Sequence, residues 1–154
     1  MRTLLRLIPL GSVLLCGCNA PLPSPAAPPF HAVVAMKQLM EWVIDPAADV
    51  IWDSVKTVMT EKGTQEIAPQ TDEQWDAVRN GAATLAESGN LLMIDGRARD
   101  GKEWMRAARR LMDAADQARK AAEAKKADAL FAAGGVVYNA CRACHQQYAP
   151  HLTQ

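Results

Sequence analysis

The 154-residue chain has no excess of charge of either sign and few aromatic residues. Its 17 basic residues balance its 17 acidic ones, and aromatic residues make up 5% of the sequence. A balanced charge without long runs of one sign argues against nucleic acid as a partner and against a disordered charged tail. The scarcity of aromatic residues and the abundance of alanine favour helices over sheets.

Several patterns that would indicate an enzyme or a β protein are also missing. The sequence contains no nucleophile–base pattern, no phosphate-binding loop and no suggestively placed pair of carboxylates. No segment alternates apolar and polar residues with the period of a strand, and no internal repeat is present. We therefore expect one helical domain that is not an enzyme.

The first 17 residues have the features of a bacterial export signal. Arg2 and Arg6 supply a positive start, and the apolar run Leu7–Leu15 is too short to span a bilayer permanently. The run ends in LCGC at residues 15–18, which resembles a bacterial lipobox except for the unusual Cys16. The resemblance implies that residues 1–17 are a signal peptide and that Cys18 becomes the lipidated N-terminus.

The alternative is ordinary signal-peptidase cleavage near Ala20, although Pro21 would then follow the cut unfavourably. Under either interpretation the protein is exported, and we expect it on the periplasmic side of the cell envelope. Residues 18–29 would be the lipidated cysteine and a tether rich in proline and alanine, because proline favours extended chain. Residues 30–154 would then form the folded domain, which the lipid anchor holds at the membrane.

The apolar residues of the folded part recur every three or four positions, the period of a helix. In the first part the expected apolar seam runs through Val33, Met36, Met40, Val43, Ala47, Val50 and Ser54. Pro46 interrupts this seam, so the two helices that flank it are expected to be nearly continuous or kinked. Expected helices cover residues 31–44, 46–60, 72–92, 102–125 and a last segment capped by Asp128, with a loop at residues 61–70. Four helical stripes with short connections predict an all-α, antiparallel four-helix bundle.

The motif Cys141-Arg142-Ala143-Cys144-His145 lies close to the C-terminus. On a helix, Cys141, Cys144 and His145 point to one side because they are three and four residues apart. A covalent c-type haem fits this arrangement, since two thiols can join its two vinyl groups while the histidine reaches the iron. Zinc would need about four ligands, with His151 as the fourth, and a dithiol redox site would need the cysteines at a helix start beside a strand.

The terminal motif, the export signal and the four helical stripes together resemble the class II c-type cytochromes, the cytochrome c′ group and its low-spin relatives. The resemblance covers about residues 30–150 and is most specific at residues 141–145. It implies one covalent haem c on the C-terminal helix, with Cys141 and Cys144 as thioether anchors and His145 as the proximal iron ligand.

The same resemblance places the sixth iron ligand on the first helix, where low-spin members carry methionine. The stretch KQLM at residues 37–40 is similar to the low-spin pattern and selects Met40, with Met36 as second choice and no protein ligand as a third possibility. Methionine is more often core filler, but a thioether ligand raises the reduction potential and is typical of electron carriers. High-spin members bind NO and CO instead.

The sequence thus predicts a single-haem cytochrome that transfers electrons to redox partner proteins of the cell envelope, with a five-coordinate protein that binds NO or CO as the alternative. Family members often form homodimers through their first helices, so a homodimer is a further possibility. The lipid anchor and Pro46 argue against carrying that property over to this chain.

Overall fold

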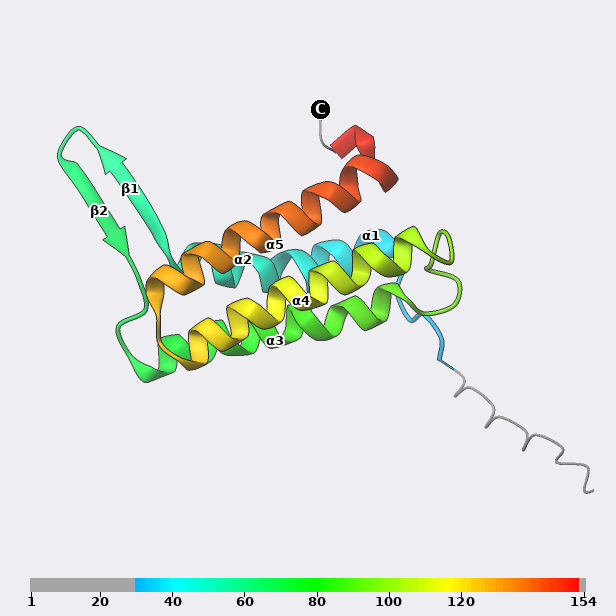
Figure 1. The fold of residues 1–154 in the computed structure, drawn as a ribbon, viewed down its shortest axis with the longest axis horizontal. Helices are drawn as coiled ribbons and strands as arrows, with labels where there is room; N and C mark the ends of the chain where they lie inside the picture. Colours follow the sequence, from blue (N-terminus) through cyan, green and yellow to red (C-terminus); the bar gives the residue numbers. More distant parts are fainter. Residues whose placement is uncertain (1–29, 153–154) are drawn as a thin grey trace, which may run out of the picture.

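A computed structural model describes residues 30–152, so the predicted signal peptide, the predicted lipidation site Cys18 and the whole predicted tether lie outside the described residues. The described part is mostly helical (Figure 1). The first helical rod consists of three consecutive segments, α1 (Met36–Leu39), a π-helical turn (Met40–Ile44) and α2 (Asp45–Ser54). The remaining elements are β1 (Lys56–Thr60), β2 (Gly63–Ile67), α3 (Asp72–Leu92), α4 (Glu103–Glu123), α5 (Ala127–Tyr148) and a 3₁₀ turn (Pro150–Leu152).

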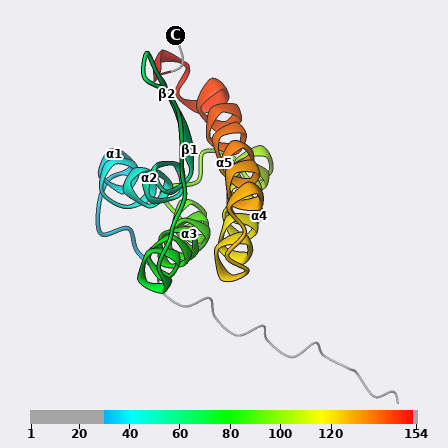
Figure 2. The same ribbon diagram turned by 90° about the vertical axis from the view of Figure 1, so that its left-hand side faces the viewer.

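The four helical segments lie side by side, as Figures 1 and 2 show from two directions. Helix α3 packs along α4, α4 along α5, and α2 along α3, whereas α2 meets α5 over only a short stretch. The prediction of a mostly helical fold with four helical segments is confirmed. The short contact between α2 and α5 matters for function, because it leaves space between the first and last helices.

Three of the predicted helices agree closely with the structure. Helix α3 begins with the predicted capping box, in which the Thr71 hydroxyl accepts from the Gln74 backbone N–H at 3.3 Å and the Gln74 side-chain oxygen accepts from the Thr71 N–H at 3.2 Å. The predicted cap of α5 by Asp128 is wrong, because α5 begins at Ala127 and its N-cap residue is Lys126. That N-cap makes no side-chain hydrogen bond.

The predicted helix over residues 46–60 is wrong in its second half, and so is the expectation of a loop at 61–70. Helix α2 ends at Ser54, and β1 pairs antiparallel with β2, with Lys56 opposite Ile67 and Thr60 opposite Gly63. The threonines and valine of β1 favour extended chain, and Gly63 takes the positive φ of 124° that the turn requires. Nearly every side chain of the hairpin is exposed on both faces, so its sequence lacks the alternation that normally reveals a strand.

The interruption predicted at Pro46 is a π-helical turn, and the helices on its two sides are continuous, as one of the two predicted alternatives had it. The Met40 carbonyl accepts from the Asp45 N–H, five residues on, and Pro46 follows directly. A wider turn relieves the clash between a proline ring and the preceding turn of helix. Because of this turn, the buried residues Leu39 and Ile44 are five positions apart instead of four. The predicted seam, which assumed a regular helix, is therefore wrong in its assignment of several core positions. Val33 and Val50 of that seam are 84% and 38% exposed, and the core positions are Leu39, Ile44, Ala47, Ala48 and Ile51.

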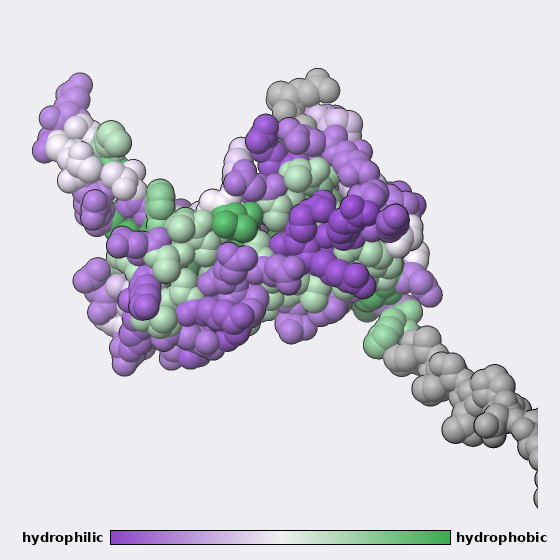
Figure 3. Space-filling view, viewed as in Figure 1, coloured by the Kyte–Doolittle hydropathy of each residue, from purple (hydrophilic) through white to green (hydrophobic). Residues whose placement is uncertain are grey.

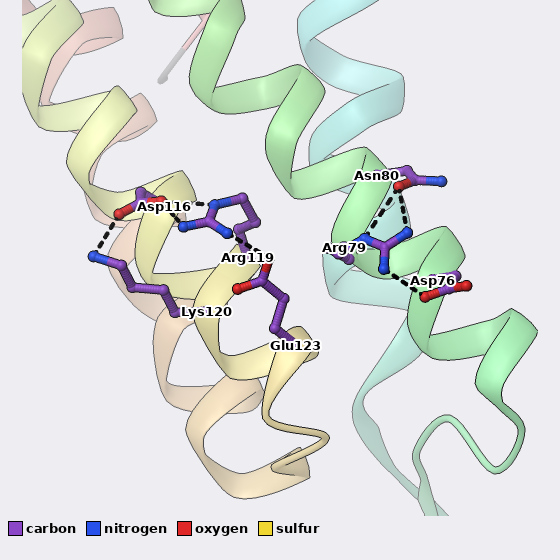
Figure 4. Close-up of polar contacts among 7 residues, drawn as sticks. All are labelled: Asp76, Arg79, Asn80, Asp116, Arg119, Lys120 and Glu123. Atoms are coloured by element: carbon purple, nitrogen blue, oxygen red, sulfur yellow. Dashed lines mark hydrogen bonds and ion pairs between the residues drawn. The ribbon is translucent and has the colours of Figure 1, made fainter.

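Most ion pairs among the described residues join two side chains of the same helix. Figure 4 shows two such groups, in which Arg119 pairs with Asp116 at 2.7 Å and Glu123 at 2.6 Å on α4, and Arg79 pairs with Asp76 at 2.7 Å on α3. These pairs are three or four residues apart and solvent-accessible, so each contributes little to stability. On the face seen in Figure 3, hydrophilic residues cover much of the helices, with apolar patches between them.

Gly89 of α3 marks a close approach to α4. A Cβ at this position would overlap the Met112 side chain and lie 3.2 Å from the Ala108 carbonyl oxygen. We expect Gly89→Ala to lower the free energy of unfolding by about 1–2 kcal/mol, because the overlap outweighs the better helix propensity of alanine. Chemical denaturation followed by circular dichroism measures this change.

Gly135 provides the matched control, since it is also a helical glycine but its Cβ would meet no atom of the described residues within 4 Å. Gly135→Ala should stabilise the protein by about 0.5–1 kcal/mol. Equal effects of the two substitutions would contradict the packing of α3 on α4 described above.

Candidate functional site

The three residues of the terminal motif lie on one side of α5. Cys141, Cys144 and His145 are each partly buried, and both cysteines are free thiols. Helix α5 continues for one turn past His145 and ends at Tyr148. The predicted helical placement of the motif is therefore confirmed, with its three functional side chains at the spacing of one helical face.

This face of α5 borders a cavity of about 480 Å³ between α5, α4 and the first helical rod. A cavity of about 300–1,000 Å³ is typical of sites for small molecules and cofactors. Met40, Cys141, Cys144 and His145 all line the cavity, whereas Met36 does not. The structure thus brings together the predicted thioether anchors, the predicted histidine ligand and the first-choice methionine.

The position of Met40 depends on the π turn. In an uninterrupted α-helix, residue 40 would lie in line with Ile44 and the core positions of α2, because these are four residues apart. The extra residue of the turn gives the core position to Leu39, which is 1% exposed, and leaves Met40 partly buried beside it. Met40 therefore faces the cavity rather than filling the core.

The walls of the cavity are mostly apolar and are held in place by hydrogen bonds. The Trp52 indole N–H donates to the Gly134 carbonyl at 3.0 Å, and the Trp104 indole N–H donates to the Leu92 carbonyl at 2.7 Å. Ala48, Ala107 and Ala108 also line the cavity, and their short side chains leave its volume open. The apolar lining from the first helical rod and α4 includes Ile44, Ala48, Trp52, Trp104, Ala107, Ala108 and Leu111.

Charged groups lie at the edge of the cavity on opposite sides. Glu41 and Asp45 line it from the first helical rod, and Arg142 lines it from α5. Burial raises the pKa of the Cys141 thiol to about 11, with smaller contributions from Cys144 and Asp45. Burial also raises the pKa of Cys144, although the positive charge of Arg110 opposes that shift. Both thiols are therefore protonated at neutral pH.

The high pKa of Cys141 has a measurable consequence in the haem-free protein. A pKa of about 11 leaves roughly one thiol in a thousand ionised at pH 8. Only the thiolate reacts, and its higher nucleophilicity offsets part of the loss. We expect iodoacetamide to alkylate Cys141 at least about tenfold more slowly in the folded protein than in urea, measured by peptide mass spectrometry at pH 8. Equal rates would show that the thiol is neither buried nor shifted.

The zinc and dithiol alternatives receive less support from this geometry. No group of three or more His, Cys, Asp or Glu side chains within residues 30–152 is placed to hold a metal ion, and His151 is exposed on the 3₁₀ turn. A reactive dithiol needs a lowered thiol pKa, which helix N-termini commonly provide. Both thiols instead lie in the last two turns of α5 and have raised pKa values.

Beside the cavity, the structure shows a contact between the end of α5 and the start of α4 that the sequence did not reveal. The Tyr148 hydroxyl donates to Asp100 at 2.5 Å, and the Tyr148 ring meets the Trp104 ring edge-on with centroids 4.8 Å apart. Partial burial and the bond to Asp100 raise the pKa of Tyr148 to about 12, and the same bond lowers the pKa of Asp100. In the sequence Asp100 only marks a turn before glycine, so its partner 48 residues away leaves no local signal.

Comparisons of the chain with protein-family models, with curated proteins and with solved structures found no match. Among the described residues, none of the helices is both long enough and apolar enough to cross a membrane.

Proposed function

We propose that this protein is a single-haem c-type cytochrome of the bacterial cell envelope, built as an antiparallel four-helix bundle, that transfers electrons. The observation that carries the proposal is the shared cavity of Met40, Cys141, Cys144 and His145. A two-cysteine, one-histidine motif on one helical face and a methionine on another helix supply the ligands of a six-coordinate c-type haem.

The cavity fits such a group by its chemistry as well as its size. Its walls are mainly apolar, its thiols are protonated, and its histidine is one residue from a thiol, as C-x-x-C-H attachment requires. When bound, a c-type haem supplies an iron that alternates between the ferric and ferrous states and so accepts and donates one electron. Among the described residues, the carboxylates and basic side chains that line the cavity are Glu41, Asp45 and Arg142, and the rest of the lining is mainly apolar.

Each residue has one role in this proposal. Cys141 and Cys144 form the two thioether bonds, and because they lie three residues apart on α5, they hold one edge of the group against that helix. His145 on α5 and Met40 on the first helical rod would be the two protein ligands of the iron. The soft sulfur of Met40 favours ferrous iron and raises the reduction potential, which suits an electron carrier.

We further infer that Cys18 carries a lipid anchor and that residues 18–29 tether the domain to the membrane, where envelope redox proteins would be its partners. The apolar run and the LCGC sequence at residues 15–18 support this inference. Because two or more acyl chains anchor a protein stably, the protein would remain membrane-bound.

Expression with a cytochrome c maturation system tests both the proposed covalent haem and the proposed lipid anchor. Intact and peptide mass spectrometry should find one haem on residues 141–144 and acyl chains on Cys18, and optical spectra should show six-coordinate, low-spin iron. Absence of covalent haem would refute the cytochrome proposal. A five-coordinate spectrum with rapid NO or CO binding would instead favour the gas-binding alternative.

A further inference from the structure

The haem-bearing half of α5 has little packing of its own. The buried residues of this helix are Leu130, Ala133, Gly134 and Val137, all in its first half. From Tyr138 to Tyr148 every residue is at least partly exposed, and in Figure 1 this end of α5 rises away from the other helices. The cavity beneath it replaces the apolar contacts that would normally hold such a segment.

Two aromatic side chains link this half of α5 to the rest of the fold: the Tyr138 ring meets the Trp52 ring of α2 edge-on, and Tyr148 makes a hydrogen bond at the end of the helix. Within residues 30–152, Tyr148 is the one side chain of residues 138–148 that hydrogen-bonds to another element, through the 2.5 Å bond to Asp100 in the α3–α4 connection. The second Asp100 oxygen accepts from the backbone N–H groups of Lys102 at 3.1 Å and Trp104 at 2.9 Å. Asp100 is therefore fixed to the start of α4, next to the Trp104 ring that lines the cavity.

The hydrogen bond between Tyr148 and Asp100 bears on the separation between the two walls of the cavity, α5 and the first helical rod. Under the proposed function, on which this inference rests, two thioether bonds and His145 make the haem move with α5. Met40 belongs to the opposite wall, on the first helical rod. The separation between these two walls then depends on how closely the end of α5 is held to the body of the protein.

We propose that Tyr148 and Asp100 are a positioning pair, whose hydrogen bond sets the spacing between the His145 and Met40 walls and so keeps Met40 within reach of the iron. Neither residue binds the iron itself. The pair acts by holding the last turn of α5 against the start of α4, where Trp104 supports both the Tyr148 ring and the cavity wall.

Tyr148→Phe tests the pair because it removes the hydroxyl and keeps the ring on Trp104. In the haem-free protein, hydrogen–deuterium exchange at residues 138–148 should become about three- to tenfold faster, as expected for loss of one partly exposed, charge-assisted hydrogen bond. In the haem-loaded protein, the five-coordinate fraction in the ferric spectrum should rise, and CO should bind the ferrous protein faster. Exchange in α3 should stay unchanged.

Asp100→Asn serves as the conservative variant. The single asparagine oxygen can keep the backbone N–H groups of Lys102 and Trp104, and the asparagine NH2 group then faces the Tyr148 hydroxyl, so the charge-assisted bond is replaced by a weaker neutral one. Its exchange rates and spectra should fall between those of the wild type and Tyr148→Phe. Wild-type exchange and a wild-type spectrum in this variant would contradict a role for the bond to the carboxylate.

Lys125→Gln is the matched control at the opposite end of α5. It removes the 2.6 Å ion pair between Lys125 and Asp72, which ties the α4–α5 connection to the start of α3. This tie is also exposed and also joins distant segments, but it lies away from the cavity lining. Exchange at residues 138–148 and the haem spectrum should both equal those of the wild type.

The outcomes separate the positioning pair from the proposed function. Wild-type exchange in Tyr148→Phe, or faster exchange with an unchanged spectrum, would overturn the positioning role while the wild type keeps its Met40-dependent spectrum. A wild-type spectrum that does not depend on Met40 would refute the Met40 ligand and, with it, this use of the pair.

Discussion

If the protein carries the proposed haem, Met40→Ala should convert its six-coordinate iron to five-coordinate iron. Met40 is the methionine that lines the cavity shared with His145, so its removal leaves the iron without a second protein ligand. We expect a high-spin ferric spectrum, rapid CO binding to the ferrous protein, and a reduction potential lower by on the order of 0.1 V or more, since axial ligands spread haem potentials over about 0.8 V. Optical spectroscopy and redox titration measure these changes.

Met36→Ala is the matched control for this prediction. Met36 lies one helical turn earlier, is also partly buried against the core, and does not line the cavity. Its variant should keep the wild-type spectrum and potential. If Met36→Ala gave the five-coordinate spectrum and Met40→Ala did not, the assignment of the ligand would be reversed. If neither did, the protein would lack a methionine ligand and the gas-binding alternative would gain support.

The double variant Cys141→Ser and Cys144→Ser should lose covalent haem completely. Both thiols face the cavity, and each forms one of the two thioether bonds in the proposal. Denaturing mass spectrometry after co-expression with the maturation system should show the mass of the polypeptide alone. Each single variant should keep at most one thioether bond, which the pyridine haemochrome spectrum detects because an unreacted vinyl group shifts its absorption band.

His145 distinguishes attachment from ligation in the same experiment. His145→Ala leaves both thiols in place, so any haem attached to it should lack its proximal ligand and show a strongly altered spectrum. Haem retained at wild-type yield by the double cysteine variant would contradict the thioether assignment. It would also leave the cavity as a site for noncovalent haem.

Local sequence signals predicted the second half of the fold well. Helix α3 was predicted at the bounds observed, including its capping box, and α4 and α5 differ from prediction by only one or two residues at most ends. These helices carry their information locally, in a regular apolar stripe and in cap residues. The motif on α5 is predictable for the same reason, since three and four residues always define one face of a helix.

The first half was predicted less well because its structure depends on distant contacts. The hairpin buries neither face, so no alternating pattern marks it. The π turn shifts the phase of the first helical rod by one residue, and only the burial of Leu39 against other helices shows that shift. The apolar seam was predicted with one constant helical period, so it could not show where the π turn changes that period.

For the site, the sequence by itself determined which residues could attach and bind a haem: Cys141, Cys144 and His145, with Met40 or Met36 as the partner ligand. Tertiary structure decided that Met40 and not Met36 faces the cavity, and that Tyr148 meets Asp100 beside it. The physical reason is the separation in sequence between the residues that meet. Helical spacing is set by neighbours three and four residues apart. The Asp100 contact instead joins residues 48 apart, and the cavity joins the first helical rod to α4 and α5, so both follow from packing of the whole chain.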